Sequence, residues 1–177
     1  ALNAETLRDL WAHLETLESD DQIKGVVITG YEGALAGADI GELAELRTQA
    51  EAEALCLRGQ AILNQIQAYS KPIVMAVNGP VMGGGAELSM ACHGRVVGAQ
   101  TIISQPEVNL GIIPGYGGTQ RLPRLIGAER AWQMLRDASI MKAREAVEWG
   151  WGDLYVDEPS VKAVQAEAIE LIRRHIS

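Results

Sequence analysis

Two glutamates stand among apolar and glycine residues, where a carboxylate needs either a partner or a chemical task. Glu87 lies within Gly85-Ala86-Glu87-Leu88, and Glu107 lies within Gln105-Pro106-Glu107-Val108. If both face one cleft, they can serve as a general acid and a general base. Taken singly, each has a plainer interpretation. Glu87 would complement a helix dipole, and Glu107 would be a loop carboxylate satisfied by backbone N–H groups.

Two small-residue segments could bring the backbone close to a ligand. Gly83-Gly84-Gly85 precedes a predicted helix, and glycine permits close approach while helix N-termini offer free N–H groups. Such groups suit a developing oxyanion; the alternative is a tight turn with close helix packing. The second segment, residues 35–40, is either another close approach or a helix start capped by Asp39.

Alternating strands and helices must position these residues. Asn3 is a plausible N-cap for a first helix, and Lys71-Pro72 ends a long one. The continuous apolar runs at 25–30 and 73–77 are typical of strands buried on both faces. Together these patterns predict an α/β domain with mostly parallel strands. Its further strands are expected at 95–98, 101–104 and 153–156, and its further helices at 48–69, 86–92, 119–126, 128–137, 143–149 and 160–175.

Composition restricts the possible functions. The chain has 177 residues, which suits one domain, and 47% of them are hydrophobic. Its net charge of −8 disfavours nucleic acid and anionic lipid as partners. No apolar run reaches the roughly 20 residues that span a membrane, so we predict no membrane partner. Cys56 and Cys92 are widely separated and fit two reduced thiols in a cytoplasmic protein.

Several familiar motifs are absent. The segment Gly115-Tyr116-Gly117-Gly118-Thr119-Gln120 departs from the dinucleotide-binding pattern at its last position and lacks the lysine of a phosphate-binding loop. The sequence contains no nucleophile elbow. Its three histidines lack metal-ligand spacing, so no metal site is predicted.

Five ordered blocks resemble the enoyl-CoA hydratase/isomerase (crotonase) family. The resemblance runs from Ala1 to about Val156. The blocks are residues 36–40, 71–79, 83–88, 105–115 and 117–122.

The resemblance implies a crotonase-like ββα spiral core with surrounding helices, forming one acyl-CoA-binding domain over residues 1–177. It implies an oxyanion hole made by the backbone N–H groups of Ala38 and Gly84. Glu87 would take a proton from water as it attacks C3 of an enoyl-CoA, and Glu107 would deliver a proton to C2. No cofactor is implied, because coenzyme A is part of the substrate. Further substrate-binding residues are expected at Ala36, Asp39, Ile40, Gly83, Pro114 and Gly115.

The chain also departs from the family pattern. An N-terminal strand and about two C-terminal helices are absent, so the domain resembles one truncated at both ends. This favours a piece of a longer β-oxidation protein, possibly fused to a 3-hydroxyacyl-CoA dehydrogenase domain and assembled as a homotrimer or hexamer. Cys92-His93-Gly94-Arg95 replaces a commonly acidic position, which we expect to alter only local packing.

Alternative functions on the same scaffold are a Δ3-Δ2 isomerase, a thioester hydrolase and a ring-opening enzyme. The alternative from a different class of function is a non-catalytic role, since some relatives are adapted to bind RNA or to act as scaffolds. The net charge and the intact glutamate pair argue against it.

Overall fold

A parallel sheet of four strands forms the centre of the computed structural model, which describes residues 2–37 and 39–176. The strands are β1 (Val26–Thr29), β2 (Ile73–Val77), β4 (Gly94–Gly98) and β7 (Leu154–Val156), in the order β1-β2-β4-β7. Val26 pairs with Ile73, and Val74 pairs with Gly94. The predicted strands are confirmed. β1 is only half-buried, however, because it lies at the edge of the sheet.

A smaller sheet contains β3 (Pro80–Met82), β5 (Ile102–Ser104) and β6 (Met141–Lys142). β3 and β5 run parallel, and β6 runs antiparallel to β5. The chain therefore repeats a unit: a strand of the large sheet, a strand of the small sheet and then a helix. The units β2-β3-α4 and β4-β5-α5 follow this order, which confirms the predicted ββα arrangement. Strand β3 was not among the strands expected from the sequence.

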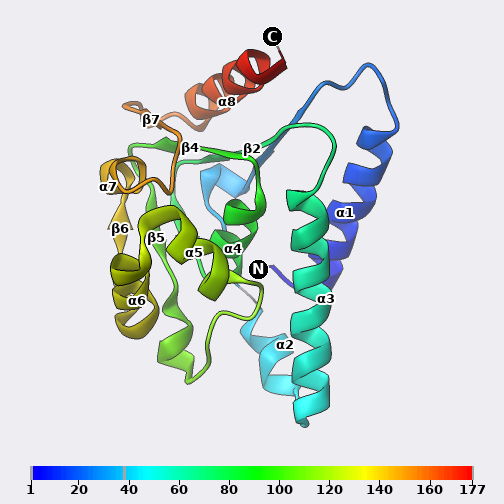
Figure 1. Ribbon diagram of the computed structural model, residues 1–177, viewed down its shortest axis with the longest axis vertical. Coiled ribbons are helices and arrows are strands. Elements are labelled where there is room, and N and C mark those ends of the chain that lie inside the picture. The colour runs from blue at the N-terminus through cyan, green and yellow to red at the C-terminus, as the bar shows by residue number, and fades with distance from the viewer. Residues whose placement is uncertain (1, 38, 177) are drawn as a thin grey trace.

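Helices cover both faces of the large sheet (Figure 1). α8 (Val161–Ile176) packs on one face, where Val164 and Ala168 meet Val74, Ala76 and Val96. The main core lies on the other face. Around it lie α1 (Ala4–Glu18), α3 (Gln49–Gln67), α4 (Gly84–Ala91), α5 (Gly118–Ile126), α6 (Ala128–Asp137) and α7 (Ala143–Glu148), whereas α2 (Ile40–Glu45) has no buried residue.

Local capping explains where the first long helices begin. The side chain of Asn3 accepts a hydrogen bond from the Thr6 N–H at 2.8 Å and caps α1, as predicted. Thr48 and Glu51 form a reciprocal capping box at the start of α3. Short 3₁₀ helices occupy Tyr31–Gly33 and Pro106–Leu110. Within the described parts of the chain, no helix combines the length and apolar character needed to cross a membrane.

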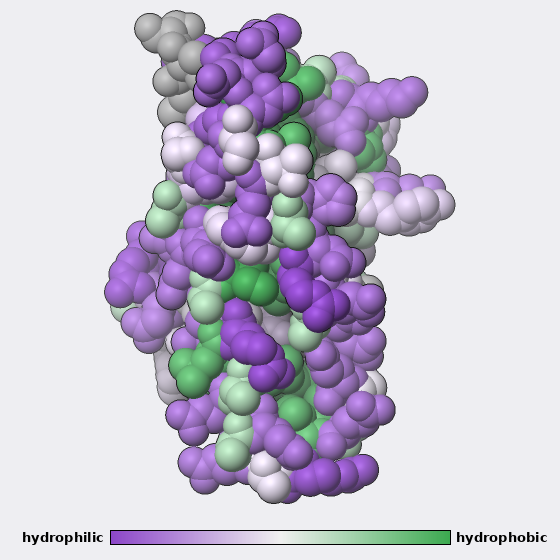
Figure 2. Space-filling model, turned by 90° about the vertical axis from the view of Figure 1, so that its right-hand side faces the viewer, coloured by the Kyte–Doolittle hydropathy of each residue, from purple (hydrophilic) through white to green (hydrophobic). Residues whose placement is uncertain are grey.

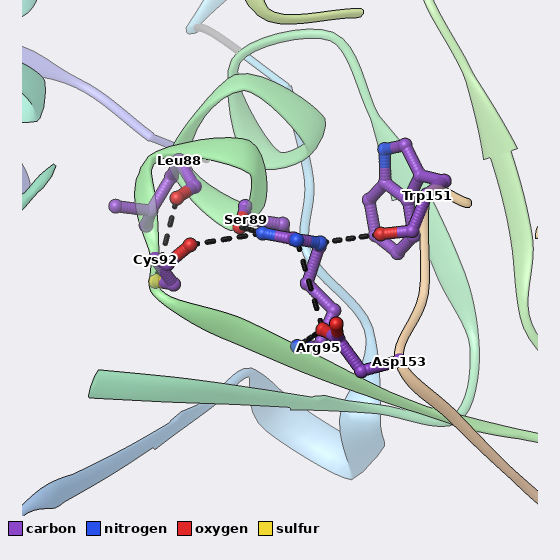
Figure 3. A network of polar contacts seen from close by, with 6 residues as sticks. All are labelled: Leu88, Ser89, Cys92, Arg95, Trp151 and Asp153. Carbon is purple, nitrogen blue, oxygen red and sulfur yellow. Dashed lines mark hydrogen bonds and ion pairs between the residues drawn. The ribbon is translucent and has the colours of Figure 1, made fainter. Parts of the chain in front are cut away.

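A buried arginine ties the end of α4 to the segment before β7 (Figure 3). The guanidinium of Arg95 donates to the carbonyls of Ser89 at 3.2 Å, Cys92 at 2.9 Å and Trp151. Asp153 accepts from the Arg95 backbone N–H at 2.7 Å and lies 3.6 Å from the guanidinium. A cation at this place satisfies carbonyls left free by the last helical turn and complements the helix dipole. Arg95 thus fixes the far end of the helix that carries Glu87.

His93, in the segment that departs from the family pattern, also has a local role. Its Nδ1 accepts from the Ile73 N–H at 2.9 Å, and its Nε2 lies 3.2 Å from the Gln67 carbonyl. The ring therefore joins the end of α3 to the start of β2. This agrees with the expectation of an effect limited to packing.

Candidate active site

The two glutamates line one cavity of about 370 Å³. Its wall is mostly apolar and comes from α2, α3, the 3₁₀ turn after β5 and the loop before α5. Lining residues include Ile40, Leu43, Leu46, Ala52, Leu55, Cys56, Met82, Gly83, Gly84, Glu87, Glu107, Leu110, Ile112, Ile113, Gly115 and Tyr116. An apolar pocket with a few convergent polar groups is typical of a small-molecule site.

Glu87 is held by the loop before α5. It is 2% exposed, and its Oε1 accepts hydrogen bonds from the N–H groups of Tyr116 at 2.9 Å and Gly118 at 2.7 Å. A Cβ at position 118 would lie 2.9 Å from this same oxygen, so the close approach requires glycine. The carboxylate therefore binds a loop distant in sequence, and the interpretation of Glu87 as a simple helix-start residue is insufficient.

Glu107 reaches the cavity from the 3₁₀ helix that follows β5. It is 8% exposed, and its Oε2 has no hydrogen-bond partner among the described residues. Its Oε1 lies beside Gly83, where a Cβ would come within 3.0 Å of it. Backbone N–H groups therefore do not satisfy both oxygens. A buried carboxylate oxygen without a donor is costly and suits a group that meets a ligand or water.

Burial raises the pKa of both glutamates. The pKa of Glu87 rises from 4.5 to about 7, chiefly because burial disfavours its charge and also because Glu107 lies nearby. The N–H groups of Gly118 and Tyr116 and the charge of Arg121 oppose this rise. Burial also raises the pKa of Glu107. The site therefore retains a proton at pH values where exposed carboxylates have lost theirs.

Helix α4 presents its N-terminus to the cavity. Gly84 is the first residue of α4 and lines the cavity, and the first N–H groups of a helix have no partner within it. Gly83 has a φ of 50°, a backbone conformation that favours glycine. Gly85 packs so tightly that a Cβ would lie 2.7 Å from the Leu35 carbonyl oxygen. The close-packing interpretation of the triplet is therefore confirmed at Gly85, and the approach of Gly83 and Gly84 to a ligand stays a prediction. Ala38, the other expected donor, lies outside the described residues.

The remaining expected substrate-binding residues divide into two groups. Ile40, Gly83 and Gly115 line the cavity. Ala36, Asp39 and Pro114 are not among its lining residues.

The residues outside the lining have local structural contacts. The side chain of Asp39 accepts from the Gly41 N–H at 2.8 Å and caps α2, as its alternative interpretation proposed. The Ala36 carbonyl packs against Gly85, and Pro114 packs near Gly118. Asp39 thus caps a helix, and Ala36 and Pro114 make close packing contacts.

Four residues that the sequence did not single out shape the site. Cys56 and Leu55 project from the middle of α3, and Cys56 Sγ would lie 2.8 Å from a Cβ at position 115. Tyr116 lines the cavity beside them. Gln105 is 1% exposed; its amide donates to the Gly83 carbonyl at 3.4 Å, and its Oε1 has no partner in the described chain. Gln105 lies within one of the blocks that resemble the family, and Tyr116 lies between two of them.

Arg121 braces the loop that holds Glu87. Its guanidinium donates to the Tyr116 carbonyl at 3.0 Å and to the side chains of Asn64 at 2.8 Å and Gln67 at 3.0 Å. These bonds join α5 and the loop to α3. The three fixed contacts use the fork geometry that distinguishes arginine from lysine.

The tryptophans are not among the residues that line the cavity. Trp151 is fully buried in the core, and Trp149 stacks with Arg130. Trp132 is 60% exposed. Among the described residues, no group of three or more His, Cys, Asp or Glu side chains is placed to hold a metal ion.

Two buried carboxylates and a helix N-terminus thus converge on one apolar cavity, an arrangement suited to binding an apolar ligand and to acid–base chemistry. The chain belongs to the enoyl-CoA hydratase/isomerase family, whose sequence profile matches residues 1–177.

Two curated relatives give more specific comparisons. The chain is 39% identical over 152 residues to a protein named "Probable enoyl-CoA hydratase" from Bacillus subtilis (strain 168), covering 85% of this chain and 58% of that protein. It is 42% identical over 154 residues to the "Fatty acid oxidation complex subunit alpha" of Idiomarina loihiensis, covering 82% of this chain and 22% of that protein. The chain thus matches only part of each relative.

Solved structures share the fold. An enoyl-CoA hydratase subunit I from Geobacillus kaustophilus superposes with a TM-score of 0.88 at 33% identity, covering 98% of this chain and 66% of that one. DspI of Pseudomonas aeruginosa gives a TM-score of 0.89 at 29% identity, covering 98% of this chain and 70% of that one. These likenesses confirm the predicted crotonase-like fold.

Proposed function

We propose that this chain hydrates trans-2-enoyl-CoA thioesters, adding water across the 2,3-double bond. The observation that carries the proposal is the meeting of Glu87 and Glu107 in one apolar cavity. A pair of carboxylates allows one group to accept a proton while the other donates one. The names of the relatives support the same activity.

Negative charge on the thioester oxygen would be stabilised at the N-terminus of α4. Gly84 is the first residue of α4 and lines the cavity, which supports its N–H as one donor, and the family resemblance adds the Ala38 N–H as a second. As water adds to C3, electron density moves through C2 toward the thioester oxygen. Fixed donors aimed at that oxygen lower the barrier, by about 3–4 kcal/mol for one donor in a comparable oxyanion hole.

The different surroundings of the glutamates support different roles. Two N–H donors and the nearby Arg121 favour the ionised form of Glu87 and oppose the burial that raises its pKa to about 7, so Glu87 acts as the base in its ionised form. Glu107 has an Oε2 without a hydrogen-bond partner among the described residues, so this carboxyl can meet the substrate and, in its protonated form, acts as the acid. Water forms a bond to C3 and gives one proton to Glu87, while Glu107 gives a proton to C2. Transfer of one proton from Glu87 to Glu107, directly or through solvent, restores the starting state.

The test is an assay of the purified chain with crotonyl-CoA and, separately, with trans-3-hexenoyl-CoA. The proposal predicts 3-hydroxybutyryl-CoA from the first substrate, identified by mass spectrometry. Conversion of 3-hexenoyl-CoA to the 2-enoyl isomer, without hydration of either compound, would assign the isomerase activity instead.

The wider setting remains a set of predictions. The printed name of the Idiomarina loihiensis relative supports a place in fatty-acid oxidation. Fusion to a 3-hydroxyacyl-CoA dehydrogenase domain, assembly as a homotrimer or hexamer, and a cytoplasmic location rest on the sequence analysis alone.

Replacing Arg121 by glutamine is expected to lower kcat/KM for crotonyl-CoA about 10- to 100-fold near neutral pH, because the loop that orients Glu87 loses its brace. The loss of a nearby positive charge also raises the pKa of Glu87, so the acidic limb of the pH profile should move to higher pH. Arg124→Gln is the matched control, since Arg124 is exposed on the same helix. Equal pH profiles for the wild type and Arg121→Gln would contradict this role.

A further inference from the structure

A second cavity of about 300 Å³ lies directly behind the wall of the first. It is formed between α1 and α3 and lined by Ala4, Leu7, Arg8, Leu55, Arg58, Gly59, Ala61, Ile62 and Tyr116. Leu55 and Tyr116 line both cavities. On the face that α1 and α3 form, Figure 2 shows apolar atoms recessed between hydrophilic side chains. Because Leu55 and Tyr116 line both cavities, they form the wall between them.

The Tyr116 ring is tightly wedged in this wall. It packs against Gly59 so closely that a Cβ there would lie 2.4 Å from two of its ring carbons. Tyr116 is 5% exposed and Leu55 is 4% exposed. The ring is held against Gly59 and, together with Leu55, separates the first cavity from the second.

The chemistry of the second cavity suits a hydrocarbon chain. Most of its lining is aliphatic, and its charged lining residues are Arg8 and Arg58. It adjoins the cavity in which the glutamates lie, on the side of α3. A chain that extends past the glutamates toward α3 would meet Tyr116 first.

We propose that Tyr116 is a specificity-determining residue that limits this site to short-chain enoyl thioesters. The space between α1 and α3 would take the distal part of a longer acyl chain once the ring is removed. This inference rests on the proposed hydratase function. Each methylene that becomes buried is expected to raise kcat/KM about fourfold, so the effect should grow with chain length.

The experiment measures kcat/KM for trans-2-enoyl-CoAs with 4, 8, 12 and 16 carbons. The wild type should favour the 4-carbon substrate over the 12-carbon one. In Tyr116→Ala, the ratio of the 12-carbon to the 4-carbon value should rise at least about tenfold, because several methylenes gain a buried site. Tyr116→Phe retains the ring and should keep the wild-type profile. If Tyr116→Ala unfolds below the assay temperature, Tyr116→Leu takes its place, because leucine also removes the ring and should raise the same ratio.

A second substitution tests where the longer chain goes. Ala61 lines the second cavity and is exposed, so tryptophan at this position can fill the cavity without entering the core. Adding Ala61→Trp to Tyr116→Ala should restore the preference for the 4-carbon substrate. A long-chain preference that survives would show that the chain leaves by another route.

The outcomes separate the two proposals. A wild type that fails to hydrate crotonyl-CoA refutes the hydratase function. A wild type that hydrates crotonyl-CoA but handles 4- and 16-carbon substrates equally refutes the role of Tyr116. An unchanged profile in both Tyr116→Ala and Tyr116→Leu does the same.

Discussion

Glu87→Gln and Glu107→Gln are each expected to lower kcat for crotonyl-CoA hydration about 10²–10⁴-fold. Glutamine keeps the size of the side chain but can neither accept the proton from water nor donate one to C2. Both side chains line the same cavity, so neither can replace the other without moving the substrate. Steady-state kinetics with crotonyl-CoA measure the loss.

The control for these variants is Glu53→Gln, because Glu53 is exposed on α3 and is not among the cavity-lining residues. It should retain wild-type kinetics. The double variant, with both glutamates replaced, should lose little more than the worse single variant, since groups that act as a unit are strongly non-additive. Near-wild-type turnover in either single variant would refute the assignment of that glutamate.

Glu87→Gln is also expected to stabilise the fold as pH rises. The native pKa of Glu87 is about 7 against an ordinary value of 4.5, so the native state holds a proton that the unfolded chain has already lost over this range. Stability from this group is present below pH 4.5 and is lost as pH rises through about 7. Glutamine has no such dependence. Relative to wild type, the free energy of unfolding of the variant should therefore gain about 2 kcal/mol between pH 5 and pH 8.

Urea unfolding at the two pH values measures this difference. Glu53→Gln again provides the comparison, because an exposed carboxylate should leave the pH dependence of stability as it is in the wild type. Parallel stability–pH curves for wild type and Glu87→Gln would show that the buried carboxylate is not held at a raised pKa.

Local signals in the sequence were sufficient to predict most of the elements. Asn3 identified the start of α1 through its own side-chain bond, and the apolar runs identified β1 and β2. β3 could not be predicted in this way, because three residues become a strand only by pairing with β5 some twenty residues later. The exposure of β1 likewise depends on its place at the sheet edge rather than on its own residues.

The residues of the site could be predicted from the sequence where they belong to one of the five blocks that resemble the family, and not elsewhere. Glu87, Glu107 and Gly84 belong to such blocks, and all three line the cavity. Cys56 and Leu55 sit in a helix whose apolar pattern resembles that of any core-facing helix, so nothing local distinguished them. Asp39 shows the converse case, since its side chain caps α2 although its block matched the family.

The most direct test of the central claim is isotope incorporation during turnover of crotonyl-CoA in D₂O enriched in ¹⁸O. If the carboxylate pair adds one water across the double bond, the product carries ¹⁸O on C3 and one deuteron on C2, and both labels fall sharply in Glu107→Gln. Recovery of unlabelled crotonyl-CoA, or release of free coenzyme A with ¹⁸O in a carboxylate, would contradict hydration at this site.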